Sequence, residues 1–143
     1  MRASELHRLA RVLREIALEA TGNTGADRVN AGQLAVLEDV ARHPRSTIGD
    51  ITERTGLAQS LVSRIVHAAA TDHALTVEQD ETDRRRVRVE LAGEVREAIL
   101  DRSRNSTEDA IATYTPHLGA EDRERLGHHL EEAAALLRQG AWS

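Results

Sequence analysis

The sequence contains no cysteine, no lysine and no phenylalanine, and these absences limit what the protein can be. Without cysteine there is no disulfide bond, no thiol-based peroxide sensor and no cysteine-ligated metal. Aromatic residues make up only 1% of the chain, so a core has to be built from Leu, Val, Ile and Ala. Each such side chain buries little area, at about 25 cal/mol per Å² of apolar surface. We therefore expect closely packed helices and further apolar burial in an oligomer.

Long apolar runs are also missing. No segment approaches the roughly 20 apolar residues that span a membrane, and the N-terminal segment lacks the apolar block of a signal peptide. This predicts a cytoplasmic protein without a membrane partner. The sequence also lacks a Gly-rich phosphate loop, a Gly-x-Ser-x-Gly elbow and a His-Glu-x-x-His helix. We therefore predict that the chain is not an enzyme and uses no cofactor.

The formal net charge is −5, which argues mildly against nucleic-acid binding, because neutralising phosphates requires positive charge. The charges are unevenly distributed, however. Three consecutive arginines, Arg84, Arg85 and Arg86, contrast with a strongly acidic segment over 121–132. A local basic surface therefore remains compatible with the overall acidity.

The spacing of apolar residues predicts helices over most of the chain. Leu6, Leu9 and Leu13 recur at three- and four-residue intervals, which is typical of an amphipathic helix over 4–20. The other predicted helices cover 31–42, a short segment capped by Ser46 or Thr47, 59–71, and 121–139.

The segment from 93 to 114 has two interpretations. Its helical period would allow one long helix, but the middle, DRSRNSTED, is polar on every side. The alternative is a break after which Ser106 and Asp109 cap a new helix.

The short helix, the turn at Gly56 and the helix over 59–71 are typical of a helix-turn-helix. A generic helical hairpin would show a similar periodicity, so this pattern alone leaves both open. Apolar and polar residues then alternate over 75–77 and 87–91, which indicates two short strands around the loop 79–85. A strand–loop–strand unit directly after a helix-turn-helix is a wing. The predicted fold class is therefore mainly α with a small β-hairpin wing.

Two segments carry a family resemblance. DETDRRRVRVELA, over 80–92, is similar to the wing signature of the MarR family of winged helix-turn-helix transcriptional regulators and keeps its Asp-x-x-Asp-x-Arg spacing. LAQSLVSRIVHAA, over 57–69, resembles the recognition helix of this family, and the resemblance extends over nearly the whole chain. His73 stands where the family usually has Gly, and His tolerates a left-handed conformation better than most residues.

The resemblance implies a winged helix-turn-helix DNA-binding domain over 31–92 and a helical dimerisation region over 1–30 and 93–143. It also implies a ligand-responsive repressor that binds a palindromic operator in double-stranded DNA as a homodimer. Regulators of this family often respond to a small aromatic or phenolic effector. No residue of this sequence can be assigned to such a ligand from the pattern.

In such a regulator the recognition helix enters the major groove, where Gln can pair with adenine and Arg with guanine or a phosphate. The resemblance also implies that the wing aspartates, Asp80 and Asp83, brace the wing while Arg85 reaches the minor groove. The alternative is a solvated hairpin, with the arginines paired to Glu78, Glu81 and Glu90. The predicted DNA-contacting residues are Arg45, Ser46, Thr47, Gln59, Ser60, Ser63, Arg64, Arg84, Arg85 and Arg86.

Apolar helix faces lie at both ends of the chain, and the resemblance implies that they interlock with a second copy. His128, His129 and Glu132 are close in sequence, but zinc requires about four ligands, so we expect no metal site. Two alternatives to the repressor remain open, namely a winged-helix module that acts through a protein partner and a metal-responsive regulator. The predicted dimer-interface residues are Leu6, Leu9, Leu13, Leu126, Leu130 and Leu137.

Overall fold

The computed structural model describes residues 1–23, 25 and 29–140. Its internal contacts divide the chain into two compact units. Residues 25–104 form one, which we call the winged-helix unit, and residues 1–24 together with 105–143 form the other, which we call the helical unit. Part of the predicted dimerisation segment over 1–30, namely residues 24 and 26–28, lies outside the described residues.

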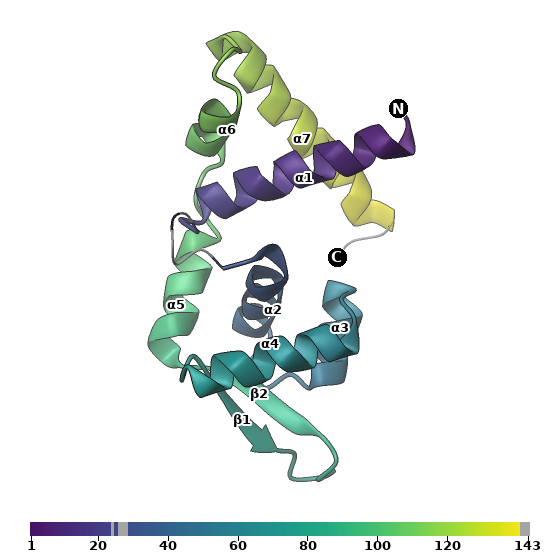
Figure 1. Ribbon diagram of the computed structural model, residues 1–143, viewed down its shortest axis with the longest axis vertical. Helices are drawn as coiled ribbons and strands as arrows, with labels where there is room; N and C mark the ends of the chain where they lie inside the picture. The colour runs from purple at the N-terminus through teal and green to yellow at the C-terminus, as the bar shows by residue number, and fades with distance from the viewer. Residues whose placement is uncertain (24, 26–28, 141–143) are drawn as a thin grey trace. The chain divides into compact units, whose positions relative to one another are not determined.

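The winged-helix unit contains four helices and one hairpin among its described residues (Figure 1). The second and third of these helices form a helix-turn-helix, and the hairpin follows it directly, which is the position of a wing. The predicted fold class, mainly α with a small β-hairpin wing, is confirmed. The elements are α2 (Ala31–Arg42), α3 (Ile48–Thr55), α4 (Gln59–Thr71), β1 (Leu75–Gln79), β2 (Val87–Leu91) and α5 (Gly93–Arg102).

Local sequence signals set the ends of the first two helices in this unit. The Asn30 side chain accepts a hydrogen bond from the Gln33 amide at 2.9 Å and thereby begins α2. Of the two predicted caps of α3, Thr47 is the one that acts, since its Oγ1 accepts from the Asp50 amide at 3.1 Å. Gly56 ends α3 in a left-handed conformation with φ of 70°, which glycine adopts without steric cost. The left-handed conformation of Gly56 produces the tight turn between α3 and α4.

The core of the winged-helix unit consists of branched aliphatic side chains, as the lack of aromatics predicts. It joins α2, α3, α4 and both strands around one apolar cluster. Because β-branched side chains have few rotamers, they lose little entropy when they pack in this way. The largest fully buried side chains are Ile51, Val36, Val40, Val62, Val66 and Val89.

The wing is a two-stranded antiparallel hairpin whose pairs run from Leu75 with Leu91 to Gln79 with Val87. The alternation over these strands places Leu75 and Leu91 in the core. His73 precedes the hairpin with φ of 61°, so the left-handed turn expected at this position is present without glycine. The wing is thereby joined to the C-terminal end of α4 through a fixed turn.

Helix α5 also packs in the winged-helix unit. It contacts α2, and the Arg96 Nε donates a hydrogen bond to the Ala41 carbonyl at 2.9 Å. The compact unit therefore extends past residue 92, where the resemblance placed the end of the DNA-binding domain. Helix α5 belongs to the winged-helix unit because it packs against α2, although it follows the wing in the sequence.

The helical unit is formed by α1 (Ala3–Ala20), α6 (Glu108–Tyr114) and α7 (Ala120–Gly140) (Figure 1). Of the two interpretations of the segment over 93–114, the break is correct. The Ser106 Oγ accepts from the Glu108 amide at 3.2 Å just before α6. Asp109 lies in the first turn of α6, where a negative charge is favourable.

The core of the helical unit is small. Among its described residues, the buried cluster consists of Ile16, Ala110 and Ile111. Several large apolar side chains of α1 and α7 remain exposed, including Leu6 at 56% and Leu137 at 50%. A unit with so little internal burial gains stability when its exposed apolar faces are covered. Across the described residues, every helix is too short or too polar to pass through a bilayer.

Candidate nucleic-acid interface

Three elements of the winged-helix unit line one open hollow of about 510 Å³. The N-terminal turn of α3 forms one wall, a face of α4 forms the second, and the end of the wing loop with the start of β2 forms the third. The hollow therefore brings together the helix N-terminus, the predicted recognition helix and the predicted wing.

Helix α4 contributes a stripe of polar side chains to this hollow. Gln59, Ser63 and His67 are spaced four residues apart, so they lie on one helix face. Of the residues predicted to contact DNA from this helix, Gln59 and Ser63 line the hollow. Ser60 and Arg64 are exposed on α4 outside it. His67 was missed from the sequence, although its spacing from Gln59 and Ser63 is a signal that could have found it.

The segment before α3 is tied into the protein. The Ser46 Oγ donates to the His43 carbonyl at 2.6 Å and accepts from Arg54 at 2.5 Å. The Ser46 carbonyl also accepts from the Val89 amide at 2.8 Å, which joins this segment to β2. Ser46 is buried, so its predicted contact with a phosphate is limited to the backbone.

At the start of α3, one backbone amide has a hydrogen-bond partner within the protein, and the next two residues line the hollow. The Thr47 amide donates to the Asp50 carboxylate at 3.0 Å and is thereby used within the protein. The next two residues, Ile48 and Gly49, line the hollow. In the first turn of a helix such amides have no intrahelical acceptor and favour an anion. Of the predicted pair Ser46 and Thr47, the Thr47 amide is thus used within the protein, while Ile48 and Gly49 of the same helix end line the hollow.

Asp50 places one negative charge on the same wall. Its pKa lies below the usual value, mainly because the Thr47 amide donates to the carboxylate, with further contributions from Arg54 and Arg88. An Arg88 Nη1 lies 4.0 Å from Asp50. The carboxylate is therefore ionised at neutral pH and partly compensated by two cations before any ligand binds.

Asp80 is the central brace of the wing loop. The Asp80 Oδ1 accepts from both the amide and the hydroxyl of Thr82 at 2.8 Å, and its Oδ2 accepts from Arg88 at 2.6 Å. These bonds stabilise the ionised form, so the pKa of Asp80 lies well below its ordinary value, with the Thr82 amide as the largest cause. The side chain is only 6% exposed. The wing loop is thereby closed by a charged and satisfied carboxylate.

Asp83 orders the tip of the same loop. Its Oδ1 accepts from the Arg85 amide at 3.0 Å, and its Oδ2 lies 3.8 Å from the Arg86 Nε. Both aspartates predicted to brace the wing therefore make contacts within it. The arginine side chain that Asp80 binds is Arg88, which was not among the predicted residues. When the observed register is continued by one residue, Asp80 and Arg88 are diagonal neighbours on one face of the hairpin. Knowledge of the register would therefore have predicted the contact between Asp80 and Arg88.

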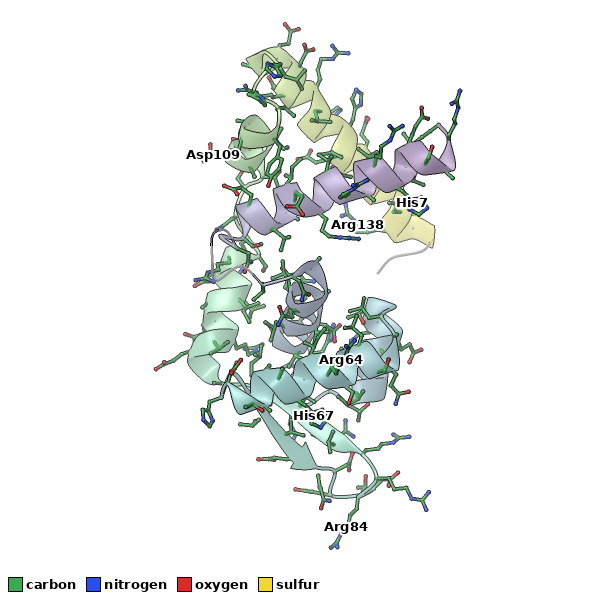
Figure 2. The ribbon with its side chains drawn as sticks, in the orientation of Figure 1. His7, Arg64, His67, Arg84, Asp109 and Arg138 are labelled. Atoms are coloured by element: carbon green, nitrogen blue, oxygen red, sulfur yellow. The ribbon has the colours of Figure 1, made fainter. Side chains whose placement is uncertain are left out.

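The arginines at the end of the wing project from the protein. Arg85 and Arg86 line the hollow, and Figure 2 shows Arg84 pointing outward from the loop. In the part of the chain that the structure describes, the guanidinium groups of Arg84 and Arg85 have no ion pair or hydrogen bond. Two cationic side chains are therefore available to an external anion.

The acidic residues of the hairpin pair with a different arginine. Glu78 and Glu90 each lie 3.9 Å from the Arg45 Nη1. Arg45 has a left-handed φ of 61°, and its carbonyl accepts from Arg88 at 3.1 Å. The solvated-hairpin alternative, in which Glu78 and Glu90 would neutralise the wing-tip arginines, is thus not the arrangement observed.

Replacement of Asp80 with asparagine is expected to weaken the wing in a pH-dependent way. A carboxylate with a lowered folded-state pKa contributes stability that is present above its unfolded pKa of about 3.9 and is lost as the pH falls through the folded value. The urea midpoint of Asp80→Asn should therefore lie below that of the wild type above about pH 5, and the difference should shrink towards about pH 2. Urea titrations across this range measure it. An equal difference at every pH would show that the charge of Asp80 is not the cause.

The predicted interface leucines fall into two groups in the helical unit. Leu13, Leu126 and Leu130 pack against the small core of their own chain. Leu6, Leu9 and Leu137 are exposed. The second group is therefore the one with apolar surface to offer a partner.

Two adjacent histidines of α7, His128 and His129, both contact the same glutamate, Glu132. The His128 Nε2 and the His129 Nδ1 each lie 3.4 Å from a carboxylate oxygen of Glu132. Over the described residues, no cluster of three or more His, Cys, Asp or Glu side chains is placed to bind a metal ion. These are ordinary exposed surface contacts, which contribute little to stability.

Comparisons with known proteins agree with this arrangement. A family model described as MarR family matches residues 28–86. A search of curated proteins finds no match. Among solved structures, a mutant of E. coli MarR complexed with operator DNA is 14% identical, with a TM-score of 0.63 and 91% of both chains covered.

Two further structures are similar over most of their length. Bordetella bronchiseptica BpsR, whose DNA binding is regulated by 6-hydroxynicotinic acid, is 19% identical, with a TM-score of 0.61 and coverage of 92% of this chain and 98% of that chain. The PcaV transcriptional regulator from Streptomyces coelicolor is 20% identical, with a TM-score of 0.61 and coverage of 93% and 97%.

A wing that follows a helix-turn-helix, together with a second helical unit, places the chain among the winged helix-turn-helix proteins. Within that class, residues 28–86 match the MarR family model, and the resemblance seen in the sequence is confirmed. The family and these neighbours are transcriptional regulators and not enzymes, which agrees with the prediction for this chain.

Proposed function

We propose that the protein is a transcriptional regulator that binds double-stranded DNA through the hollow between α3, α4 and the wing. In this proposal α4 enters the major groove, and Arg85 of the wing enters the adjacent minor groove. The observation that supports it most strongly is that the α3 amides, the polar stripe of α4 and the wing arginines line one concave surface. An anionic duplex would meet hydrogen-bond donors from all three elements at once.

The individual contacts follow from side-chain chemistry. Gln59 can form two hydrogen bonds with an adenine, and Ser63 can bond to a base edge or a phosphate. The exposed side chains of Ser60 and Arg64 would extend the contact beyond the hollow to the backbone. Arg84 and Arg86 would neutralise phosphates on either side of the minor groove. Specificity in this scheme comes from α4, and much of the affinity comes from the wing.

The operator is proposed to be a palindrome that a homodimer binds. A two-fold dimer presents two identical reading heads, so its half-sites lie about one helical turn apart. The exposed leucines of α1 and α7 support the assignment of the dimer interface to the helical unit. The DNA-binding domain in this scheme covers residues 31–92, and the dimerisation region covers 1–30 and 93–143.

We also propose that DNA binding responds to a small aromatic or phenolic effector. The support is the structural similarity to BpsR, in which 6-hydroxynicotinic acid regulates DNA binding. Addition of 6-hydroxynicotinic acid and related phenolic acids to the protein–DNA complex tests this part. Release of DNA by one of them, with no effect of a saturated carboxylic acid of similar size, is the expected result.

Selection of bound duplexes from a random pool, at two salt concentrations, tests the DNA-binding proposal. We expect recovery of a palindromic site with A·T-rich flanks, because narrow A·T minor grooves attract arginine. Non-specific binding that collapses with salt and enriches no sequence would contradict it. That outcome would favour a winged-helix module that acts through a protein partner, since the fold alone does not fix the function.

A further inference from the structure

Of the three polar side chains that α4 contributes to the hollow, His67 is the one to which the proposed function assigns no contact. It lies on the same stripe of α4 as Gln59 and Ser63, one turn nearer to the C-terminal end of the helix. Figure 2 shows it on the side of α4 that faces the hairpin. Its ring is exposed, so an external ligand can reach it.

The ring of His67 is oriented by its own helix. The Nδ1 lies 2.6 Å from the Ser63 carbonyl oxygen, and the Ser63 hydroxyl is 3.4 Å away. A carbonyl oxygen can only accept, so Nδ1 carries a hydrogen in both the neutral and the protonated ring. The Nε2 therefore carries a hydrogen only in the protonated ring. Its state decides whether His67 offers an acceptor or a charged donor.

The surroundings of His67 favour an anion. Arg85 and Arg86 of the wing line the same hollow, whereas α3 contributes one acid, Asp50. Helix α4 itself has no acidic residue. Because the Thr47 amide and two arginines lower the pKa of Asp50, that carboxylate stays ionised over the range in which histidine titrates. Among the residues that line the hollow in the described part of the chain, His67 is the only histidine, the side-chain type that can be neutral or cationic near neutral pH.

The location of His67 identifies which part of the duplex it meets. If α4 occupies the major groove and the wing occupies the minor groove, the sugar–phosphate backbone that separates the grooves passes between them. His67 lies on the wing side of α4 and shares the hollow with Arg85 and Arg86. It therefore faces the backbone and not the base edges.

We propose that His67 binds a DNA phosphate in its protonated form, so that proton uptake accompanies DNA binding and the affinity for DNA falls as the pH rises. The proposal rests on the proposed DNA-binding function and adds to it a further contact and its dependence on pH. A protonated Nε2 donates a charge-assisted hydrogen bond to phosphate, whereas the neutral Nε2 has no hydrogen to donate.

The test is the affinity of the full-length protein for its selected duplex, measured by fluorescence anisotropy at constant ionic strength. Wild-type affinity should fall about tenfold between about pH 6 and pH 8, the range in which histidine loses its charge. His67→Gln should be weak and nearly independent of pH. His67→Arg should bind tightly across the whole range, because its charge is permanent. His128→Gln, on α7, is the matched control and should follow the wild type.

Salt dependence provides a second readout, one that a merely structural role of His67 would not change. At about pH 6 the slope of log affinity against log salt should be shallower in His67→Gln by about 0.9 per protomer, the value for one lost phosphate contact. Parallel pH profiles of the wild type and His67→Gln, with specific binding that depends on Arg85, would overturn this inference alone. A change in the preferred bases without a change in the pH profile would also overturn it. Absence of specific binding at every pH would instead overturn the proposed function.

Discussion

The Arg85→Ala variant is expected to bind its selected duplex about 5- to 150-fold more weakly, the effect of about 1–3 kcal/mol per arginine contact with DNA. Arg85 is positioned before DNA arrives, because the Asp83 carboxylate accepts from its backbone amide. Its guanidinium meanwhile has no partner in the described part of the chain. Loss of this side chain therefore removes a contact without disturbing the loop. Equilibrium titration of labelled duplex at fixed salt measures the effect.

The matched control for this prediction is Arg102→Ala. Arg102 is exposed on α5 in the same unit and does not line the hollow. Its removal changes the net charge equally, so any loss of affinity shared by both variants reflects only long-range attraction. A similar weakening in Arg102→Ala and Arg85→Ala would refute a specific role for the wing.

Acidic substitution of the exposed leucines is expected to have the largest effect on operator binding. Leu6→Asp and Leu137→Asp should each convert the proposed dimer into a monomer, because a carboxylate in an apolar interface loses its hydration without gaining a partner. A monomer binds only one half-site. The affinity for the full palindrome should fall by about 100-fold or more, since the second half-site no longer acts at high effective concentration.

Sedimentation velocity measures the first part of this prediction, and titration of the full palindrome measures the second. Gln139→Asp, at an exposed polar position of α7, adds a carboxylate without removing an apolar side chain and should remain dimeric. If Leu6→Asp and Leu137→Asp sediment as the wild type does, the helical unit is not the dimer interface.

The elements of the winged-helix unit were predictable because local signals repeat along the chain. Periodicity located α2 and α4 to the residue, and alternation located the two strands. The break before α6 was left open by the sequence, since a polar stretch is compatible with a solvent-bridging helix or with a new cap. In the structure α5 ends at Arg102 and α6 begins at Glu108, so the break is the arrangement observed.

Two features of the site that the sequence did not reveal, the burial of Ser46 and the partner of Asp80, depend on which segments pair in the fold. Ser46 is buried because its carbonyl pairs with Val89, a residue 43 positions later. The partner of Asp80 is Arg88 because the strand register brings them together, and register is set by the whole hairpin. The Ser46 contact has no signature in a short window of sequence, whereas the Asp80–Arg88 pair becomes readable once the hairpin register is known.

The apolar faces of the helical unit show a second limit of prediction from sequence. Leu13 and Leu137 both lie at helical spacing, so their patterns in the sequence are equivalent. The structure packs Leu13 against the core of its own unit and leaves Leu137 exposed. Which apolar residue lies within the protomer and which remains for a partner depends on how α1, α6 and α7 meet. Periodicity contains no information about that packing.

Hydroxyl-radical footprinting of the wild-type protein on its selected duplex tests most directly whether the hollow is a DNA-binding surface. We predict backbone protection on both sides of two successive major grooves, centred about 10 base pairs apart, with flanking minor-groove protection that disappears in Arg85→Ala. Protection without this spacing, or flanking protection that persists in Arg85→Ala, would contradict the placement of α4 and the wing on DNA.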